Sequence, residues 1–402
     1  MNVLVVNCGS SSIKYSLYRM QDHAAGEVLA SGIVEKIGNP PSRLRHKAGE
    51  KAESREVQAP DHRAAFALLM QALAEGPAAV IAGPAEIQAV GHRVVHGAER
   101  FTGSVRVDAD VIKALEDFSS LAPLHNPPNL VGLREAMRLM PDVPHVAVFD
   151  TAFHQTLPVH AYLYALPYDL YTKHRIRRYG FHGTSHRYVT EAAARVLGRP
   201  LSDTNVITAH LGNGCSITAV SGGKSIDTSM GMTPLEGLVM GTRCGDLDPG
   251  LVFHLIRSLG KTFDEVDSLL NRESGLLGVS GVSNDMREVV EAAAAGNPRA
   301  GLAVEIFCYR IKKYIGAYTA VLGRVDALVF TGGIGENAAG IRERTCRGLE
   351  PLGYVLDAAR NAAGARGPRD VSADGSPHRI LVIPTDEELM IARDTARIAA
   401  GA

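Results

Sequence analysis

Apolar positions along the chain follow two periods, one typical of strands and one typical of helices. Residues 206–220 form two β-rich runs around a Gly-Asn-Gly turn, and 221–223 close the second run. Residues 3–18 form a looser copy, in which Ser12-Ile13 falls where Ser216-Ile217 falls later. Glycine in such a turn lets backbone amides approach a phosphate with no Cβ in the way. The pattern therefore predicts two half-molecules, each beginning with a phosphate-binding hairpin.

The remaining pattern predicts alternating helices and strands. Residues 3–57 are expected to form a meander with a solvated loop, and the mixed charges of 43–56 indicate a wet face. Helical spacing is found in 62–75, 109–118, 130–140, 185–197, 251–259, 285–295, 299–322 and 387–400. Further strands are predicted at 87–95, 143–149, 325–330 and 378–384. The prolines of 121–128 are expected to stop the helices on either side.

The same order of hairpins and βα units occurs twice, which indicates a duplicated α/β domain with a cleft between the halves. The amino-acid composition changes after residue 150, and residues 157–171 are rich in Tyr and Pro. We therefore expect an N-terminal domain of residues 1–150, completed by the closing helix 387–402. Residues 151–386 are expected to form the second, nucleotide-binding domain.

Composition narrows the class of protein. The chain has 402 residues, of which 46% are apolar and 21% charged, enough for two sizeable cores. With 42 basic and 43 acidic residues the net charge is −1, so the chain as a whole has no positive potential that would attract nucleic acid or an anionic membrane. Five cysteines without metal-like pairs predict a reducing compartment, and no apolar run is long enough to span a bilayer. We expect a cytoplasmic protein with a small-molecule partner.

Three motifs have a structural interpretation that outweighs the functional one. Residues 222–225 resemble the tail of a P-loop, but no helix is predicted to follow them. His182 and His186 could share a helix face, yet the glutamate of a zinc-binding HExxH motif is missing. The glycines of 332–335 lie near the C-terminus, without the early βαβ unit that a dinucleotide site needs.

Charged residues at strand and helix ends point to anion chemistry. Arg93 interrupts a buried-looking strand, where an unpaired cation would be costly, so it should meet an anion. Arg243 lies in a glycine-containing stretch flexible enough to bring its guanidinium group to a carboxylate or phosphate. Asp150 ends a strand, where it could orient those arginines or hold Mg²⁺. The remaining candidates of this kind are His182, His210, Asp285, Arg287 and Glu387.

Taken together, these segments resemble the acetate and propionate kinase family, within the superfamily of sugar kinases, heat-shock ATPases and actin. The matching segments run through nearly the whole chain in order: 7–14, 91–97, 124–128, 149–154, 179–186, 210–214, 227–250 and 331–337. This chain departs from the family pattern at Ala98, where Gly is common, and at Cys244, where Ser is usual. Asp386 stands where Asn is usual, which adds charge beside a metal ligand.

The resemblance implies a fold and a set of site residues. The fold would be two actin-like, ribonuclease H-like domains with an interdomain cleft. Catalytic roles fall to Asp150, His182 and Arg243. Acyl substrate would meet Arg93, Val95, Leu124, Phe181 and Pro234. Asn7 and Glu387 would hold the metal. ATP contacts are implied for Ser10, Ser12, Lys14, His210, Leu211, Gly212, Asn213, Gly214, Asp285, Met286, Arg287, Gly333, Ile334, Gly335, Glu336 and Asn337.

The function implied by the resemblance is reversible transfer of the γ-phosphoryl group from ATP to acetate, giving acetyl phosphate and ADP. Mg²⁺, with Mn²⁺ as an alternative, would be the cofactor, and a homodimer the assembly. An ionised carboxylate needs no general base, so direct in-line transfer is expected, with Asp150 orienting ligands rather than taking a proton. Two alternatives stay open: a propionate kinase with a wider pocket, and a non-catalytic, ATP-switched assembly protein on the same scaffold.

Overall fold

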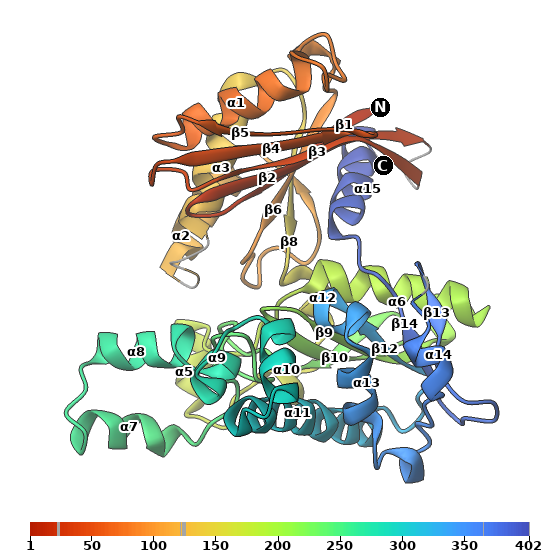
Figure 1. The fold of residues 1–402 in the computed structure, drawn as a ribbon. Helices are drawn as coiled ribbons and strands as arrows, with labels where there is room; N and C mark the ends of the chain where they lie inside the picture. Colours follow the sequence, from red (N-terminus) through yellow and green to blue (C-terminus); the bar gives the residue numbers. More distant parts are fainter. Residues whose placement is uncertain (22–24, 121, 123–125, 365, 402) are drawn as a thin grey trace. The chain divides into compact units, whose positions relative to one another are not determined.

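The computed structural model divides into two compact units. The first unit contains Met1–Phe153 and Asp386–Ala402, and the second contains His154–Thr385. The structure describes the whole chain except residues 22–24, 121, 123–125, 365 and 402 (Figure 1). The division into folding domains expected at residues 150 and 386 stays a prediction. Among the described helices, none is both long and apolar enough to cross a bilayer.

The sheet of the first unit has the strand order β5-β4-β3-β2-β1-β6-β8-β7. Its strands are β1 (Asn2–Cys8), β2 (Ser12–Gln21), β3 (Ala25–Glu35), β4 (Ser42–Ala48), β5 (Lys51–Val57), β6 (Ala89–Val94), β7 (Val105–Arg106) and β8 (His145–Phe149). The strands from β1 to β5 form an antiparallel meander, β1, β6 and β8 run parallel, and β7 is antiparallel to β8. This confirms the predicted N-terminal hairpin and the two buried strands that follow it.

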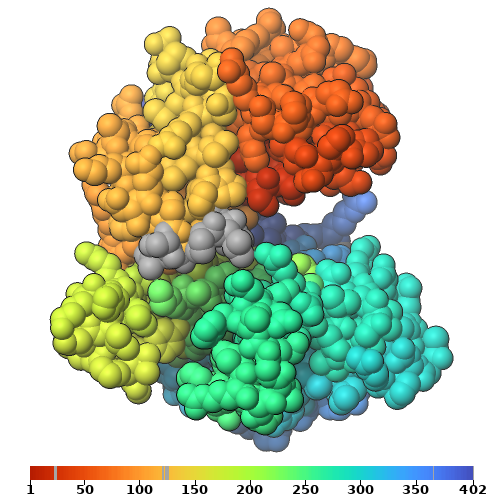
Figure 2. All heavy atoms as spheres, turned by 90° about the vertical axis from the view of Figure 1, so that its left-hand side faces the viewer, coloured from red at the N-terminus to blue at the C-terminus, as the bar shows by residue number. Residues whose placement is uncertain are grey.

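Helices cover both faces of this sheet. They are α1 (His62–Ala74), α2 (Ala109–Asp117), α3 (Asn126–Leu139) and α15 (Glu387–Ala399), with 3-10 turns at Pro84–Glu86, Phe118–Ser120 and Ala152–Thr156. In β1, Leu4 and Val6 face α1, whereas Val3 and Val5 face α15, because successive side chains of a strand point to opposite faces. Figure 1 shows α15 across the sheet from α1 and α3, and Figure 2 shows the residues of α1 and α3 side by side at the surface.

Two expectations for this unit were wrong. The charged run 43–56 is not a loop but the hairpin β4–β5, in which Leu44 and His46 are buried while the alternating Arg43, Arg45 and Lys47 are exposed. Helix α3 begins at Asn126, four residues before its predicted start. Pro127 and Pro128 therefore lie in its first turn, where the missing N–H groups would have no intrahelical partner anyway.

The sheet of the second unit has the order β11-β10-β9-β12-β14-β13. Its strands are β9 (Asn205–Leu211), β10 (Cys215–Ser221), β11 (Lys224–Thr228), β12 (Ala327–Thr331), β13 (Arg369–Asp370) and β14 (Arg379–Val382). The hairpin β9–β10 confirms the prediction for residues 206–220. Strand β12 is buried at every position, as a parallel strand covered on both faces must be.

The second unit is richer in helices than the sequence pattern predicted. Its helices are α4 (Val159–Tyr162), α5 (Tyr168–His174), α6 (Gly183–Leu197), α7 (Pro249–Arg257), α8 (Phe263–Arg272), α9 (Gly275–Ser280), α10 (Met286–Ala294), α11 (Pro298–Leu322), α12 (Gly332–Asn337), α13 (Ala339–Cys346) and α14 (Ala358–Ala362). Two 3-10 turns, Leu201–Asp203 and Glu350–Leu352, complete it. Helices α6 and α11 pack on opposite faces of the sheet (Figure 1).

The two sheets share one topology. The series β3-β2-β1-β6-β8-β7 in the first unit matches β11-β10-β9-β12-β14-β13 in the second. In both, an antiparallel hairpin leads to two parallel neighbours and a short antiparallel edge strand. The predicted duplication of an α/β fold is therefore confirmed.

Candidate functional site

The first unit presents a polar hairpin end. Asn7 is the last residue but one of β1 and lies opposite Lys14 of β2, and the turn between the strands is held by a 2.8 Å bond from Gly9 N to Ser12 O. Lys14 is exposed and pairs with Glu388 of α15 at 2.5 Å. Ser10 is exposed in the same turn. The predicted phosphate-binding residues of this unit therefore occupy one hairpin end, beside the start of α15.

A second group of this unit joins the ends of two neighbouring strands. Arg93 in β6 bonds Asp150, which directly follows β8, from Nε to Oδ1 at 3.0 Å and from Nη2 to Oδ2 at 2.6 Å. The Asp150 side chain is 2% exposed. The charge of Asp150 raises the pKa of the Arg93 guanidinium, and the nearby Glu387 adds to this effect. The anion predicted for Arg93 is thus a buried carboxylate of the same unit.

Glu387 begins α15 close to this ion pair. Burial raises the pKa of its carboxyl group, as do Asp150 and Glu388, while Arg93 and Lys14 oppose the rise. Two carboxyl groups this close repel each other when both are ionised, and a bound dication would relieve that repulsion. Mg²⁺ prefers one or two carboxylates with water and phosphate oxygens, and Glu387 and Asp150 are carboxylates of the kind that such an ion takes.

Asp386, the departure noted beside this ligand set, is the N-cap of α15. Its Oδ1 accepts the Leu389 N–H at 2.8 Å, and Tyr18 Oη donates to it at 3.4 Å. Aspartate and asparagine cap helices about equally well, and the negative charge favours a helix N-terminus. The negative charge of Asp386 therefore stabilises the N-terminus of α15.

Two predicted acyl-pocket residues belong to this unit. The Val95 N–H bonds Oδ1 of Asn129 in α3 at 3.0 Å, which fixes the end of β6 against that helix. Leu124 lies outside the described residues. Ala98, which replaces a common glycine, is buried with φ of 49°, a backbone region that costs a non-glycine residue about 1–2 kcal/mol.

In the second unit, histidine and arginine side chains converge on the glycine turn of β9–β10. His182 is the N-cap of α6, with φ of 57°, and its ring stacks on that of His210 with centroids 4.3 Å apart. A Cβ on Gly214 would lie 2.8 Å from Nη2 of Arg243 and 3.3 Å from Nε2 of His182. A side chain at position 214 would therefore push both donors away from the turn.

Arg243 is a partly buried cation whose surroundings in this unit contain no paired carboxylate among the described residues. Burial lowers the pKa of its guanidinium, and its Nη1 donates to the neutral Pro234 carbonyl at 2.6 Å. Across the described part of the chain no carboxylate pairs with it. A buried charge without a counter-ion is costly, so this position is suited to a phosphoryl group or carboxylate supplied by a ligand.

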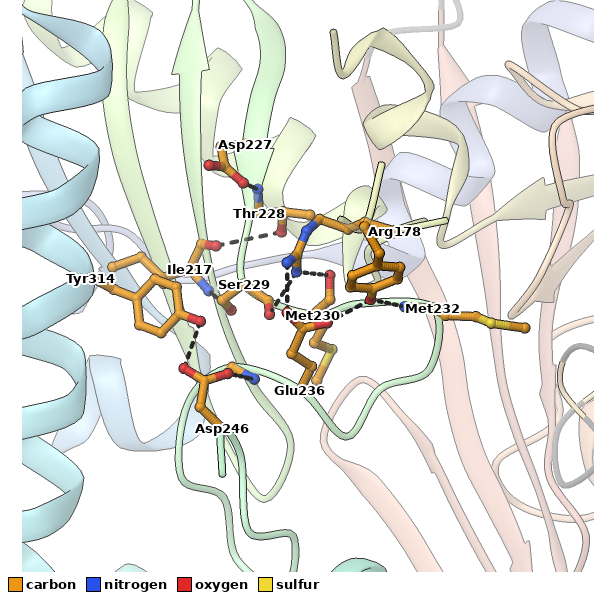
Figure 3. Close-up of polar contacts among 12 residues, drawn as sticks. Arg178, Ile217, Asp227, Thr228, Ser229, Met230, Met232, Glu236, Asp246 and Tyr314 are labelled. Carbon is orange, nitrogen blue, oxygen red and sulfur yellow. Dashed lines mark hydrogen bonds and ion pairs between the residues drawn. The ribbon is translucent and has the colours of Figure 1, made fainter. Parts of the chain in front are cut away.

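The loop that carries Pro234 and Arg243 is held by a polar network, shown in Figure 3. Nη2 of Arg178 bonds Oε1 of Glu236 at 2.6 Å, and its Nη1 bonds the Ser229 and Met230 carbonyls at 3.1 and 3.0 Å. Tyr164 Oη donates to Oε2 of Glu236 at 2.6 Å. Sequence reasoning did not single out Arg178 or Glu236, because only the fold brings them together.

A second anchor fixes the end of the same loop (Figure 3). Asp246 accepts the Gly237 N–H at 2.8 Å and the Tyr314 hydroxyl of α11 at 2.9 Å. Arg310, one turn away on α11, reaches the same carboxylate at 3.2 Å. The loop is thereby tied to the long helix of this unit.

The three predicted nucleotide segments of this unit meet at one cavity of about 670 Å³. It is lined by Gly212, Asn213, Asn284, Asp285, Met286, Arg287, Val290, Glu291, Gly333, Ile334, Asn337 and Ala338. Arg287 and Asp285 form an exposed pair, with Nη2 and Oδ2 2.5 Å apart, and this pairing lowers the pKa of Asp285 to about 2. Segments separated by more than 100 residues thus share one wall.

Some residues predicted for nucleotide binding do not line that cavity. Glu336 accepts the Gly332 and Thr385 N–H groups at 3.0 and 3.2 Å, so its carboxylate supports the turn that starts α12. His210, Leu211, Gly214 and Gly335 likewise lie outside the lining. Gly222 and Gly223 form the tight turn between β10 and β11, and residues 224–225 begin β11 rather than a helix, which confirms that this stretch is not a P-loop.

Comparison with known proteins agrees with this geometry. Residues 2–393 match the model of the acetokinase family. The chain is 53% identical over 398 residues to a protein of Clostridium novyi (strain NT) named acetate kinase, covering 99% of this chain and 98% of that one. A solved Porphyromonas gingivalis acetate kinase superposes with a TM-score of 0.94 at 49% identity, covering 99% of both chains.

A solved structure named as a propionate kinase, from Francisella tularensis, is similar too. Its TM-score is 0.92 at 45% identity, and the match covers 98% of this chain and 99% of that one. Full-length identity at this level and the match to the family model lead to the same family assignment. The chain belongs to the acetokinase family.

Proposed function

We propose that this chain is an acetate kinase, which reversibly transfers the γ-phosphoryl group of ATP to acetate and yields acetyl phosphate and ADP. The observation that carries this proposal is Arg243, a partly buried cation without a carboxylate partner in the described chain, beside His182 at the Gly214 turn. Two donors that approach the same glycine turn suit a transferring phosphoryl group. The similarity to acetate kinases supports the same reading.

The reaction requires that acetate and the γ-phosphoryl group be positioned and that the phosphate charge be neutralised. A carboxylate oxygen of acetate attacks the γ-phosphorus, the bond from that phosphorus to the bridging oxygen breaks, and the electron pair leaves with ADP. Acetate, with a pKa near the 4.3 or so of a glutamate side chain, is ionised at pH 7, so no proton is removed. Asp150 is already bonded twice by Arg93, which supports an orienting role.

Each unit would supply part of the machinery. In the first unit, Arg93 would meet the acetate carboxylate, and Lys14 with Ser10 and Ser12 would meet nucleotide phosphates. In the second unit, Arg243 and His182 would meet the transferring group, and the cavity lined by residues 212–213, 284–287, 333–334 and 337 would take the nucleoside.

A divalent ion would be held by Asn7 and Glu387, with Asp150 next to it. When bound, Mg²⁺ neutralises phosphate charge as the phosphoryl group is transferred. The effect of Asp150 on Glu387 supports this assignment, because the charge of Asp150 raises the pKa of the Glu387 carboxyl group in the absence of a cation.

The nearer alternative is a propionate kinase, favoured by the similarity to the Francisella protein. Val95, Phe181 and Pro234, with Leu124, would wall the acyl group, and one methylene in such a pocket is worth only about 1–3 kcal/mol. The choice therefore depends on rates rather than on the presence or absence of a residue.

Hydroxylamine trapping tests both statements. The purified chain, ATP and Mg²⁺ are incubated with acetate, propionate or butyrate, and the acyl hydroxamate is measured. We expect the highest kcat/KM for acetate. A higher value for propionate would make the chain a propionate kinase, and no hydroxamate with any acid would favour a non-catalytic, ATP-switched assembly protein.

We also propose a homodimer that acts in the cytoplasm. The cysteines at 8, 215, 244, 308 and 346 are all free thiols, which supports a reducing compartment. The dimer follows from the resemblance to the family alone. Light scattering that shows an active monomer in dilute solution would contradict it.

A further inference from the structure

Three buried side chains of the second unit form a continuous chain of hydrogen bonds that ends on the partly buried His182. Thr208 Oγ1 of β9 lies 2.7 Å from Nδ1 of His186 in α6. Nε2 of His186 lies 2.7 Å from Oγ of Ser216 in β10, and the same Oγ lies 2.8 Å from Nδ1 of His182. Thr208, His186 and Ser216 are fully buried.

The protons of this chain can be ordered in two ways. The Ser216 hydroxyl has one proton and faces two ring nitrogens, so one histidine must donate to it while the other accepts from it. Burial and the neighbouring His154 and His210 hold the pKa of His186 well below its usual value, so His186 is neutral and carries a single ring proton. The order is therefore decided at the other end of the chain, by Thr208.

Thr208 selects one order. If His186 donated from Nδ1, the Thr208 hydroxyl proton would need another acceptor, and within the described residues that hydroxyl makes no other hydrogen bond. A buried hydroxyl left without an acceptor costs about 1–3 kcal/mol. Thr208 therefore donates to Nδ1 of His186, His186 donates from Nε2 to Ser216, and Ser216 donates to Nδ1 of His182.

We propose that Thr208, His186 and Ser216 are positioning residues that hold neutral His182 with its proton on Nε2. This proposal rests on the proposed function of His182 as a donor to the transferring phosphoryl group. Nε2 is the ring nitrogen on the side of the Gly214 turn and Arg243. The nitrogen that carries the proton is set by the hydrogen bond made by the other one. His182 then presents a donor at that turn without having to be positively charged.

Nitrogen-15 NMR of histidine-labelled protein, with neither ATP nor acetate present, tests the tautomer directly. The His182 and His186 signals are assigned from His182→Gln and His186→Gln variants. His154 serves as an internal standard, because its Nε2 bonds the Phe181 carbonyl at 2.9 Å and must be the donor. We expect the Nε2–H pattern for both His182 and His186. A proton on Nδ1 of His182 in the unaltered protein overturns the proposal.

Variants of the relay test its effect on turnover. Ser216→Ala removes the donor to His182 and should turn its ring into a mixture of tautomers, with kcat lowered about 10- to 100-fold, as for other residues that orient a functional histidine. The KM for acetate should change less than about twofold, since the substituted group binds no substrate. Unchanged kcat and an unchanged Nε2–H signal in Ser216→Ala would contradict the assignment.

Thr208 provides a second test with a matched control. Thr208→Val should loosen the tautomer of both histidines, and Thr208→Ser, which keeps the hydroxyl, should restore it. Thr218 lies opposite Thr208 in the β9–β10 ladder, is equally buried, and bonds Thr228 at 2.8 Å. Thr218→Val should leave both histidine signals and kcat unchanged. If Thr208→Val and Thr218→Val lost kcat and the Nε2–H signals equally, the effect would come from packing, and the proposal would be overturned.

The two failures are distinguishable. The tautomer is read without substrates, so a chain with the Nε2–H pattern that forms no acyl phosphate would contradict the proposed function and leave the relay standing. Formation of acyl phosphate by a chain whose His182 carries its proton on Nδ1 would contradict the relay alone.

Discussion

The guanidinium of Arg93 holds the carboxylate of Asp150 with two hydrogen bonds, 3.0 and 2.6 Å long, at the ends of neighbouring parallel strands. Asp150 is almost completely buried, whereas a quarter of the Arg93 side chain is exposed. The buried Asp150 thus fixes the orientation of Arg93, and the exposed part of Arg93 can contact a ligand.

Arg93→Ala should lower kcat about 10²- to 10³-fold, because it removes a charge contact to the reacting group. It should also cost about 3 kcal/mol of unfolding free energy, since Asp150 is left buried and unpaired. Adding Asp150→Ala should restore part of the stability but none of the activity, as measured by chemical unfolding and hydroxamate formation. Arg45→Ala, at an exposed ion pair of the same unit, is the control. Near-normal turnover in Arg93→Ala would refute its role.

Gly214→Ala should impair turnover while the protein stays folded. The new Cβ would lie 2.8 Å from Nη2 of Arg243 and 3.3 Å from Nε2 of His182, so both donors must shift. We expect kcat to fall about 100-fold, the size typical of a misplaced reacting group. Gly316→Ala, in the middle of α11 with open space around it, should keep full activity and gain about 0.5–1 kcal/mol of stability. Equal kinetics in the two variants would contradict the crowding argument.

Glu236→Gln should destabilise the second unit and disturb the loop that carries Arg243. It removes the anionic partner of Arg178, and breaking a buried ion pair on one side costs about 3–5 kcal/mol, with less expected here because Glu236 is one-third exposed. Tyr164→Phe removes a hydroxyl that donates to Glu236 and accepts the Met232 N–H, and should cost less, about 1–2 kcal/mol. Calorimetry of both variants checks this order. A larger loss for Tyr164→Phe would contradict the charge pairing.

Acid should destabilise the first unit through a pair of buried histidines. His92 Nε2 lies 3.0 Å from His145 Nδ1, and burial lowers the pKa of both rings. The unfolded chain, with histidine pKa values near 6.5 or so, binds more protons than the folded chain below that pH. Stability should therefore be lost as pH falls below about 6.5, by up to about 1.4 kcal/mol per pH unit for each ring. Urea unfolding between pH 7.5 and 5 measures the slope, which His92→Gln should reduce; an unchanged slope would rule the pair out.

Much of the fold could be predicted because its central strands carry strong patterns. The hairpin around Gly212 and Gly214 has long apolar runs on both sides of a glycine turn, and the structure has it as predicted. The hairpin β4–β5 was missed because Leu44 is the only large apolar side chain on the buried face of β4, so charges hid the two-residue period. Helix α8 was missed although Thr262 and Glu265 form a capping box that was readable in the sequence.

The candidate site was predictable where one residue conflicted with its local pattern. Arg93 stood out as a charge inside a buried strand, and the structure supplies its carboxylate partner. The Arg178–Glu236 pair and the relay through Ser216 could not be found in this way. A serine in a strand or a glutamate in a loop is ordinary by itself, and only the tertiary fold brings these groups within hydrogen-bonding distance.

The central claim is that a carboxylate oxygen of acetate attacks the transferring γ-phosphorus. Acetate labelled with ¹⁸O in both carboxylate oxygens, incubated with ATP, Mg²⁺ and the purified chain, tests it by ³¹P NMR. The account predicts that acetyl phosphate forms in equal amount to ADP, and that its phosphorus signal carries the isotope shift of one bridging ¹⁸O. Inorganic phosphate released without acetyl phosphate, or acetyl phosphate without the isotope shift, would contradict it.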